Sequence, residues 1–199
     1  MPPVTQSLIV ANVAGFLLER MLGGRMIEWF ALWPGAGPAA LPLETPWQLV
    51  TYAFLHANLA HLAFNLFGLW MFGSDLERVW GGRRFFACFL CSVLAGGATQ
   101  LAAGSMFGTG YGPVLGASGG VFGLLLAFAI CFPRRQVMLL FPPIPMPAPL
   151  FVTVYALLEL ALGVTGTQAG VAHFAHLGGM LGGFLSLQFF RGRFPFGRR

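Results

Sequence analysis

The chain alternates between long apolar segments and short polar ones, and the apolar segments have the length of membrane-spanning helices. Each holds close to the ~20 residues that cross ~30 Å of hydrocarbon. Together they predict spans at about 5–22, 48–73, 84–104, 115–132, 150–166 and 171–190. The pattern therefore predicts an all-α membrane protein, with a six-transmembrane-helix bundle that forms a single domain over residues 1–199.

Two of the connections differ from the short polar loops elsewhere. The stretch from Gly23 to Pro46 is long and contains Trp29 and Trp33. Tryptophan is enriched at membrane–water interfaces, so we expect a long interfacial first loop. The stretch from Pro142 to Pro149 carries five prolines in eight residues. Because proline breaks helices, this stretch is expected to be a rigid, non-helical connector.

Composition agrees with a membrane location. Of the 199 residues, 57% are hydrophobic and only 9% are charged, whereas about a quarter of a soluble domain is charged. The net charge of +5 comes from arginines in short loops and near the C-terminus. No basic stripe with interleaved aromatic residues is present, so the expected partner is the lipid bilayer and no nucleic acid. The first residues lack the basic start of a signal peptide, so the first apolar segment is expected to remain as a span.

Arginine positions predict the orientation. Nine arginines fall on one predicted side of the membrane and two, Arg20 and Arg25, on the other. Positive residues concentrate in cytoplasmic loops, so both termini are expected in the cytoplasm. The nine are Arg78, Arg83, Arg84, Arg134, Arg135, Arg191, Arg193, Arg198 and Arg199.

A serine and a histidine lie at matched depth in two predicted spans. Ser118 lies 16 residues before Arg134, or ~24 Å along a helix. His176 lies 15 residues before Arg191, or ~22 Å. Both positions are in the outer half of the bilayer, and the pair suggests a nucleophile with its base. Taken alone, a serine in a membrane helix is more often a packing residue bonded to its own backbone.

The second predicted span brings two more polar side chains to this depth. His61 and Asn65 are four residues apart and share one helix face. Counted from Arg78, they lie at ~25 Å and ~20 Å, on either side of the Ser118 level. Polar side chains inside a membrane usually face the bundle interior or a water-filled cavity, although a lone histidine or asparagine often only joins helices.

Glycines on the fourth and sixth spans predict a close approach of these two helices. Gly119 and Gly123 form a small-xxx-small pattern, and Gly178/Gly182 and Gly179/Gly183 do so on the sixth span. Such faces let two backbones approach closely, as a Ser118–His176 hydrogen bond requires. Ser118 would also lie near a helix N-terminus, where free N–H groups favour an oxyanion.

A third carboxylate at the Ser118 level is not expected, so the sequence predicts a dyad. Glu159 is the acid inside a predicted span, but its count along the fifth span puts it near mid-bilayer, below Ser118. A structural hydrogen bond is the favoured role for Glu159. His173 lies one turn outward from His176, at ~27 Å, and could compete as the base.

Other patterns predict less. Cys88-Phe89-Leu90-Cys91 matches a redox C-x-x-C, but inside an apolar helix packing is the favoured reading. Gly116 to Gly120 matches the G-x-S-x-G nucleophile elbow, which needs a preceding strand in a soluble sheet, so that interpretation is rejected. We find no metal-ligand cluster and no phosphate-binding loop, so no metal, ATP or other cofactor is expected.

Three segments together resemble the rhomboid intramembrane serine proteases. They are H-A-N-L-A-H-L-A-F-N from His56, G-A-S-G from Gly116 and A-H-L-G-G from Ala175. The resemblance covers nearly the whole chain and implies a rhomboid-like bundle in its minimal six-span form. It implies Ser118 as nucleophile, His176 as general base, and an oxyanion site of His61, Asn65 and the Ser118 N–H. It implies supporting roles for His56, Gly116, Gly119 and Phe122, the last as the aromatic that packs on the histidine.

The resemblance implies an intramembrane serine endopeptidase that cleaves transmembrane segments of single-span or multi-span membrane proteins near the outer face. It implies a bacterial inner (plasma) membrane. The alternatives are a catalytically silent rhomboid-like protein that binds membrane clients, and a small transporter or channel. A transporter often has repeated halves and charged pathway residues, and the chain has no internal repeat. The sequence does not indicate the oligomeric state or the natural substrate.

Overall fold

The computed structural model describes residues 1–34, 45–107, 112–138, 143–166 and 170–192. Part of the predicted interfacial loop (35–44), Pro142 of the predicted connector, and the three arginines after residue 192 lie outside the described residues. Within the described part, the chain is mainly helical, and every segment predicted as a span contains helix.

Along the described residues, the elements are helices except for one short β-hairpin. They are α1 (Pro3–Leu22), α2 (Gly24–Phe30), α3 (Gln48–Thr51), the 3₁₀ turn η1 (Tyr52–Phe54), α4 (Leu59–Gly68), the π-helical η2 (Leu69–Gly73), α5 (Ser74–Trp80), α6 (Gly82–Phe107), α7 (Ser118–Cys131), β1 (Gln136–Met138), β2 (Pro145–Pro147), α8 (Ala148–Thr165) and α9 (His173–Phe190).

The second span differs from its prediction at both ends. Continuous helix begins at Leu59, not at 48, and runs through η2 and α5 to Trp80. Asn58 ends the preceding irregular segment in an extended conformation, and its side chain accepts a hydrogen bond from the His61 N–H at 2.8 Å. This N-cap satisfies one of the free donors of the helix start and thereby sets the start.

The fourth span is shorter than predicted. Its helix, α7, begins at Ser118 and holds 14 residues, which is ~20 Å. Gly116 has φ +115°, a conformation that helices do not use and side-chain-bearing residues rarely adopt. The helix therefore starts inside the bundle, two residues after this glycine.

The proline-rich connector is a hairpin followed directly by helix. β1 and β2 pair antiparallel, with Gln136 opposite Pro147 and Met138 opposite Pro145. The prediction of a non-helical stretch is wrong at its last two residues, because α8 begins at Ala148 and includes Pro149. Proline is tolerated there because the first helical turn has no acceptor for its N–H groups.

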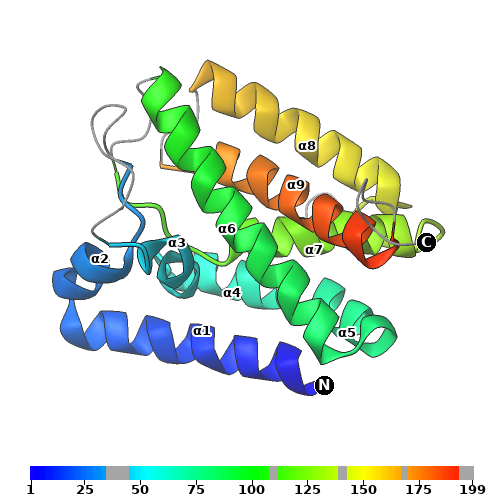
Figure 1. Ribbon diagram of the computed structural model, residues 1–199, viewed down its shortest axis with the longest axis horizontal. Coiled ribbons are helices and arrows are strands. Elements are labelled where there is room, and N and C mark those ends of the chain that lie inside the picture. The colour runs from blue at the N-terminus through cyan, green and yellow to red at the C-terminus, as the bar shows by residue number, and fades with distance from the viewer. Residues whose placement is uncertain (35–44, 108–111, 139–142, 167–169, 193–199) are drawn as a thin grey trace.

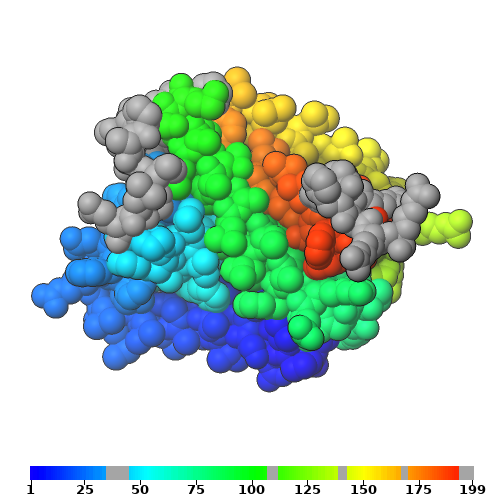
Figure 2. Space-filling view, in the orientation of Figure 1, coloured from blue at the N-terminus to red at the C-terminus, as the bar shows by residue number. Residues whose placement is uncertain are grey.

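Helices α6, α7 and α9 form the centre of the bundle. α1 and α8 lie on opposite sides, and α6 crosses obliquely between them (Figure 1). In the space-filling view α6 is a continuous band, with α1 on one side of it and α8 and α9 on the other (Figure 2). Buried side chains of α6 and α7, such as Phe85, Phe89 and Leu124, fill the core between them.

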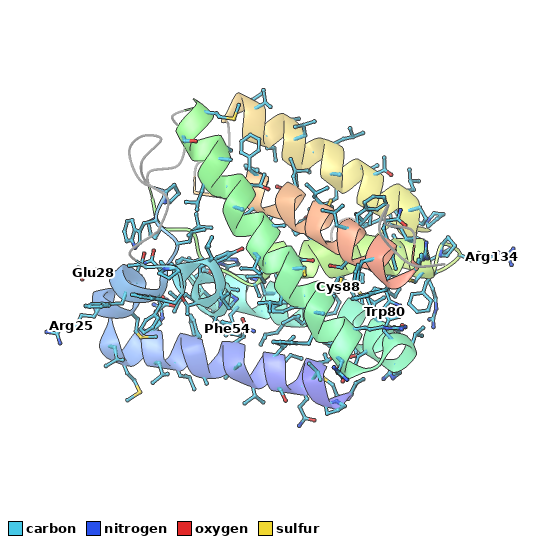
Figure 3. All side chains as sticks on the ribbon, in the orientation of Figure 1. Arg25, Glu28, Phe54, Trp80, Cys88 and Arg134 are labelled. Carbon is cyan, nitrogen blue, oxygen red and sulfur yellow. The ribbon has the colours of Figure 1, made fainter. Side chains whose placement is uncertain are left out.

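The two ends of the bundle carry different charges. Arg134 projects from one end, near Trp80, whereas Arg25 and Glu28 project from the other (Figure 3). α1 begins and α9 ends at the Arg134 end (Figure 1). There Asp75 pairs with Arg78 at 2.7 Å and Arg135 at 3.9 Å.

Among the residues that the structure describes, two helices are long and apolar enough to cross a membrane: Gly82–Met106 and Ala148–Thr165. Ser118–Cys131 is a shorter apolar helix. Large apolar side chains are also exposed on the outward faces of α1, α4, α8 and α9, for example Leu17, Phe64, Leu157, Val164 and Phe189. Exposed apolar surface of this extent marks an interaction site. Because the exposed apolar side chains are spread over four helices, lipid is the partner that fits them.

The glycines of α9 pack on two different helices. A side chain at Gly179 or Gly183 would collide with the backbone of Gly119 or Gly123 on α7. A Cβ at Gly182 would instead lie 2.6 Å from the Cys91 carbonyl oxygen on α6. The expectation that Gly182 faces the fourth span is therefore wrong, and Gly179 and Gly183 have that position. The two glycine rows differ by one residue, which rotates them by about 100° around the helix.

Candidate active site

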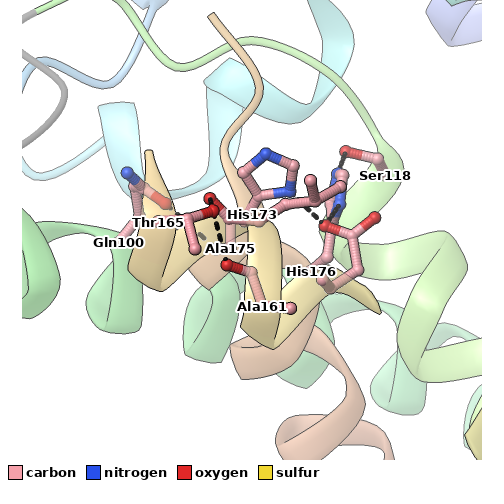
Figure 4. Close-up of polar contacts among 9 residues, drawn as sticks. Gln100, Ser118, Ala161, Thr165, His173, Ala175 and His176 are labelled. Carbon is pink, nitrogen blue, oxygen red and sulfur yellow. Dashed lines mark hydrogen bonds and ion pairs between the residues drawn. The ribbon is translucent and has the colours of Figure 1, made fainter. Parts of the chain in front are cut away.

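Ser118 and His176 lie side by side where α7 and α9 both begin. The Ser118 Oγ is 2.8 Å from the Nε2 of His176 (Figure 4). Ser118 is the first residue of α7, and His176 lies in the first turn of α9. The Gly119–Gly179 backbone contact one to three residues further on brings the two helix starts within hydrogen-bonding distance.

The turn before Ser118 requires glycine. Besides its positive φ, Gly116 has no room for a side chain, because a Cβ there would lie 2.7 Å from the Nε2 of His61. The Gly116 N–H donates to the Tyr52 carbonyl at 2.9 Å. Gly116 thus fixes the path of the chain into α7 and leaves space for the His61 ring.

His61 and Asn65 lie on one face of α4, beside this turn. Asn65 is 4% exposed, and its Nδ2 donates to the His61 carbonyl at 3.1 Å. The same Nδ2 would be 3.5 Å from a Cβ at Gly116. Both side chains therefore lie close to the segment that leads into Ser118, whose helix has unpaired N–H groups in its first turn.

Two aromatic contacts hold the histidine rings. Phe122, one turn after Ser118, stacks on His176 with ring centroids 4.3 Å apart and an interplanar angle of 11°. His56 is fully buried and meets His61 edge-on at 5.1 Å. The backbone N–H of His56 donates to the Glu19 carboxylate at 3.0 Å, which anchors the segment before α4 to α1.

Glu159 reaches the same site, contrary to the depth predicted for it. Its Oε2 is 2.6 Å from the Nδ1 of His173 and 3.0 Å from the Nδ1 of His176. The depth count compared backbone positions along straight, parallel helices, whereas the contact is made by the long side chain of Glu159 and reaches the far ring nitrogen of His176 and not Ser118 itself. His173 does not contact Ser118, and its Nε2 has no hydrogen-bond partner among the described residues.

The structure also corrects the expectation that no cluster of metal-ligand residue types would form. In the described part of the chain, Glu159, His173 and His176 bring three atoms of ligand type within 4.8 Å of one another.

Cys88 and Cys91 are free thiols, the first buried and the second exposed, and neither lines the cavity described next.

A cavity of about 860 Å³ opens beside the Ser118–His176 pair. Its polar lining includes His61, Asn65, Ser118 and His176, while most of the remainder is apolar side chains of α4, α7, α8 and β1. Phe151 and Tyr155 of α8 also line it. The arrangement thus combines a hydroxyl, an imidazole and amide-type donors at one point of an otherwise apolar groove.

Sequence reasoning missed two other residues near the pair. Gln100 on α6 accepts a hydrogen bond from the Ala175 N–H at 3.1 Å and thereby satisfies a donor of the first turn of α9 (Figure 4). Tyr155 packs against Phe122 in a tilted arrangement, with ring centroids 5.5 Å apart. Gln100 could have been predicted, because a lone glutamine in an apolar helix indicates a buried hydrogen bond. Nothing in the sequence singles out Tyr155.

Comparisons with known proteins point to one family. A family model described as "Rhomboid domain" matches residues 43–193. Rhomboid protein 1, mitochondrial, of Saccharomyces cerevisiae is 33% identical over 150 residues, covering 69% of this chain and 40% of the yeast protein. Rhomboid protease GluP of Bacillus subtilis is 29% identical over 187 residues, covering 93% of this chain and 34% of GluP.

A third relative, rhomboid protease GlpG of Serratia proteamaculans, is 28% identical over 191 residues. That match covers 92% of this chain and 61% of GlpG. The chain therefore spans from 34% to 61% of the length of these three relatives.

Proposed function

The chain belongs to the rhomboid family, and from this membership and the site geometry we propose that it is an intramembrane serine endopeptidase. Its substrates are the transmembrane segments of membrane proteins. The observation that carries the proposal is the 2.8 Å contact between Ser118 Oγ and His176 Nε2 beside a cavity. This is the spacing of a nucleophile hydrogen-bonded to its general base.

The proposed reaction is acyl transfer in two halves. His176 Nε2 takes the proton of Ser118 as Oγ attacks the scissile carbonyl carbon, whose oxygen becomes an oxyanion. His176 then gives the proton to the leaving amine as the C–N bond breaks, and a serine ester remains. Water deprotonated by His176 attacks the ester, and collapse of the second tetrahedral intermediate releases the new carboxyl end and restores Ser118.

The oxyanion needs donors that are already in place. We assign this role to the Ser118 N–H at the start of α7 and to the side chains of His61 and Asn65. Their position on the cavity lining supports the assignment, as does the direction of the α7 dipole. Asn65 now donates to its own helix, and a rotation about its side-chain bonds would turn the amide toward the substrate.

Six membrane spans with both termini in the cytoplasm are part of the proposal. α1 begins and α9 ends at one end of the bundle (Figure 1), which supports an even number of crossings. That end also carries Arg78, Arg134 and Arg135, whereas Arg25 lies at the other (Figure 3). This asymmetry favours the arginine-rich end as cytoplasmic, in a bacterial plasma membrane, with cleavage in the outer half.

The form of the substrate follows from the cavity. A helix protects its own peptide carbonyls by hydrogen bonding, so a transmembrane segment must unwind before Ser118 can reach one. We therefore expect small or helix-destabilising residues near the cut. The largely apolar lining suits an unwound stretch of such a segment, and the polar side chains around Ser118 suit the water that hydrolysis needs.

The test uses purified full-length protein in liposomes with a panel of single-span proteins. A fluorophosphonate probe should label the wild type, and Ser118→Ala should abolish labelling and cleavage together. Ser186→Ala is the matched control, because Ser186 is another buried serine and bonds to the Gly182 carbonyl of its own helix. Cut sites are mapped by mass spectrometry.

Cleavage that persists in Ser118→Ala would overturn the proposal. A wild-type protein that neither labels nor cleaves, but binds the same single-span proteins, would favour the alternative of a catalytically silent client-binding protein.

A further inference from the structure

The carboxylate of Glu159 lies where serine hydrolases of other folds carry the third group of a triad. It is 5% exposed and projects from α8 toward α9. Its Oε2 is shared by two imidazoles, at 2.6 Å from His173 Nδ1 and 3.0 Å from His176 Nδ1. The opposite ring nitrogen of His176 faces Ser118 at 2.8 Å (Figure 4). Ser118, His176 and Glu159 thus form a continuous line.

The close approach of α8 and α9 makes this reach possible. Gly163 lies one turn after Glu159, and a Cβ there would be 3.1 Å from the Cβ of His173. The neighbouring apolar residues of α8, such as Leu157, Leu158 and Leu160, are exposed. Glu159 is therefore the buried polar residue of a helix whose other faces are largely turned outward.

The tautomer of His176 is the property that this contact controls. An ionised carboxylate only accepts hydrogen bonds, so a ring nitrogen that faces it carries the proton. With the proton on Nδ1, Nε2 has a free lone pair and can accept the proton of Ser118. The other tautomer would present N–H to Ser118 and could not act as a base.

We propose that Glu159 is a positioning residue of the proposed protease: it holds His176 as the Nδ1–H tautomer and stabilises the imidazolium that forms when Ser118 attacks. The inference rests on the proposed function. His173 is the second donor to the same oxygen, and it holds the carboxylate in place while the Nδ1–H of His176 is not aligned with it. Nδ1 of His176 lies 3.0 Å from this oxygen but has no aligned hydrogen-bond partner among the described residues, so the hydrogen bond forms when the ring turns toward Glu159.

A bound metal is the competing explanation for three ligand-type atoms in one place. Tetrahedral zinc with bonds of ~2.0–2.1 Å keeps its ligand atoms ~3.3 Å apart. The two nitrogen–oxygen separations here, 2.6 Å and 3.0 Å, are shorter than that spacing, and the one to His173 is a hydrogen bond. Zinc bound to His176 Nδ1 would also displace the proton that the base needs there.

The first experiment reads the tautomer directly and needs no cleavage. The chain has four histidines. In ¹⁵N spectra of histidine-labelled enzyme in lipid, each signal can be assigned by substituting one histidine at a time and observing which signal disappears. We expect the Nδ1–H form for both His176 and His173 in the wild type. An Nε2–H form at His176 in the wild type would overturn the proposal whether or not the protein proves to be a protease.

The second experiment separates kcat from KM. Glu159→Gln keeps the shape of the side chain, but its amide can donate to Nδ1 and stabilise the wrong tautomer. Because Glu159 is expected to act through His176 and not on the substrate, kcat should fall by roughly 10²–10⁴-fold, the range of a general-base contribution. KM should stay within about twofold.

The matched control is Glu77→Gln, which removes the charge of another buried carboxylate far from Ser118. It should leave kcat and the His176 tautomer as in the wild type. A kcat for Glu159→Gln within about threefold of the wild type would overturn the inference, as would loss of activity in EDTA that zinc restores. If the fluorophosphonate probe did not label the wild type, that result would instead contradict the proposed function.

Discussion

Two buried carboxylates in this molecule have the same burial and very different partners. Glu77 on α5 is 4% exposed and Glu159 on α8 is 5% exposed. Glu77 accepts hydrogen bonds from the Val4 N–H at 2.9 Å, the Thr5 N–H at 2.6 Å and the Thr5 hydroxyl at 2.7 Å. Glu159 instead faces two imidazoles with a single oxygen.

The difference lies in what the partners can do with a proton. Backbone amides and a hydroxyl keep their protons near neutral pH, so Glu77 makes a fixed joint between α5 and the first turn of α1. Imidazoles gain and lose protons in the physiological range. Around Glu159, the Nδ1 of His176 and the Nε2 of His173 also have no aligned partner among the described residues. Similar burial therefore does not imply an equal role, and the proposal for Glu159 depends on its partners and not on its burial.

The largest expected effect is the loss of the base. His176→Ala should reduce cleavage to the background rate, because the imidazole that contacts Ser118 is gone and no other described side chain contacts that hydroxyl. His173→Ala should keep measurable turnover, since His173 contacts Glu159 and not Ser118. Initial rates on one mapped substrate decide the matter. If His173→Ala abolished cleavage and His176→Ala retained it, His173 and not His176 would be the general base.

The next effect concerns the oxyanion donors. His61→Ala and Asn65→Ala should each lower kcat by about 10²–10³-fold, the usual loss for one such donor, while fluorophosphonate labelling remains detectable. The double variant tests whether the two act together. Unchanged kcat in His61→Ala would remove that residue from the oxyanion site and leave it a packing role beside Gly116.

The glycine rows of α9 offer a paired test of dyad geometry. In Gly183→Leu the new side chain meets the Gly123 backbone and should force α9 away from α7. Misplacing catalytic groups by about 1 Å can cost ~10²-fold in rate. Gly182→Leu meets α6 instead, so we expect it to lower the melting temperature with a smaller loss of kcat. Equal kcat losses would show that the α7–α9 contact has no special role in the dyad.

The sequence predicted the family and the positions of the helices better than their ends. The family model match confirms the resemblance that the His56, Gly116 and Ala175 segments indicated. Hydrophobicity placed the second span at 48–73, although the cap at Asn58 was available as a start signal. Apolarity extends through the irregular residues before a helix, so hydropathy alone cannot locate the first turn.

Lateral packing was the part that could not be predicted. Glu159 was placed below Ser118 because depth was counted for the backbone of straight, parallel helices, whereas the contact is made between side chains of α8 and α9. Gly182 was assigned to the wrong neighbour because two glycine rows on one helix look alike in sequence. Depth and rotation depend on where each helix starts and how it tilts, and residue spacing within one helix does not carry that information. The number of membrane crossings stays a prediction.

The smallest expected effect on activity is at the other carboxylate. Glu77→Gln leaves the first turn of α1 with an amide that can accept fewer of its hydrogen bonds, and an unsatisfied buried donor costs about 1–3 kcal/mol. Thr5→Ala removes the hydroxyl alone and should cost less. Melting temperature in detergent should fall in that order, while kcat, measured well below the transition, should stay within about twofold of the wild type. The contrast with Glu159→Gln is then complete, because the same chemical change affects stability at one site and turnover at the other. A Glu77→Gln enzyme that melted normally but lost turnover would show that α1 and α5 act on the dyad across the bundle, and that the partner set of a carboxylate does not reveal its role.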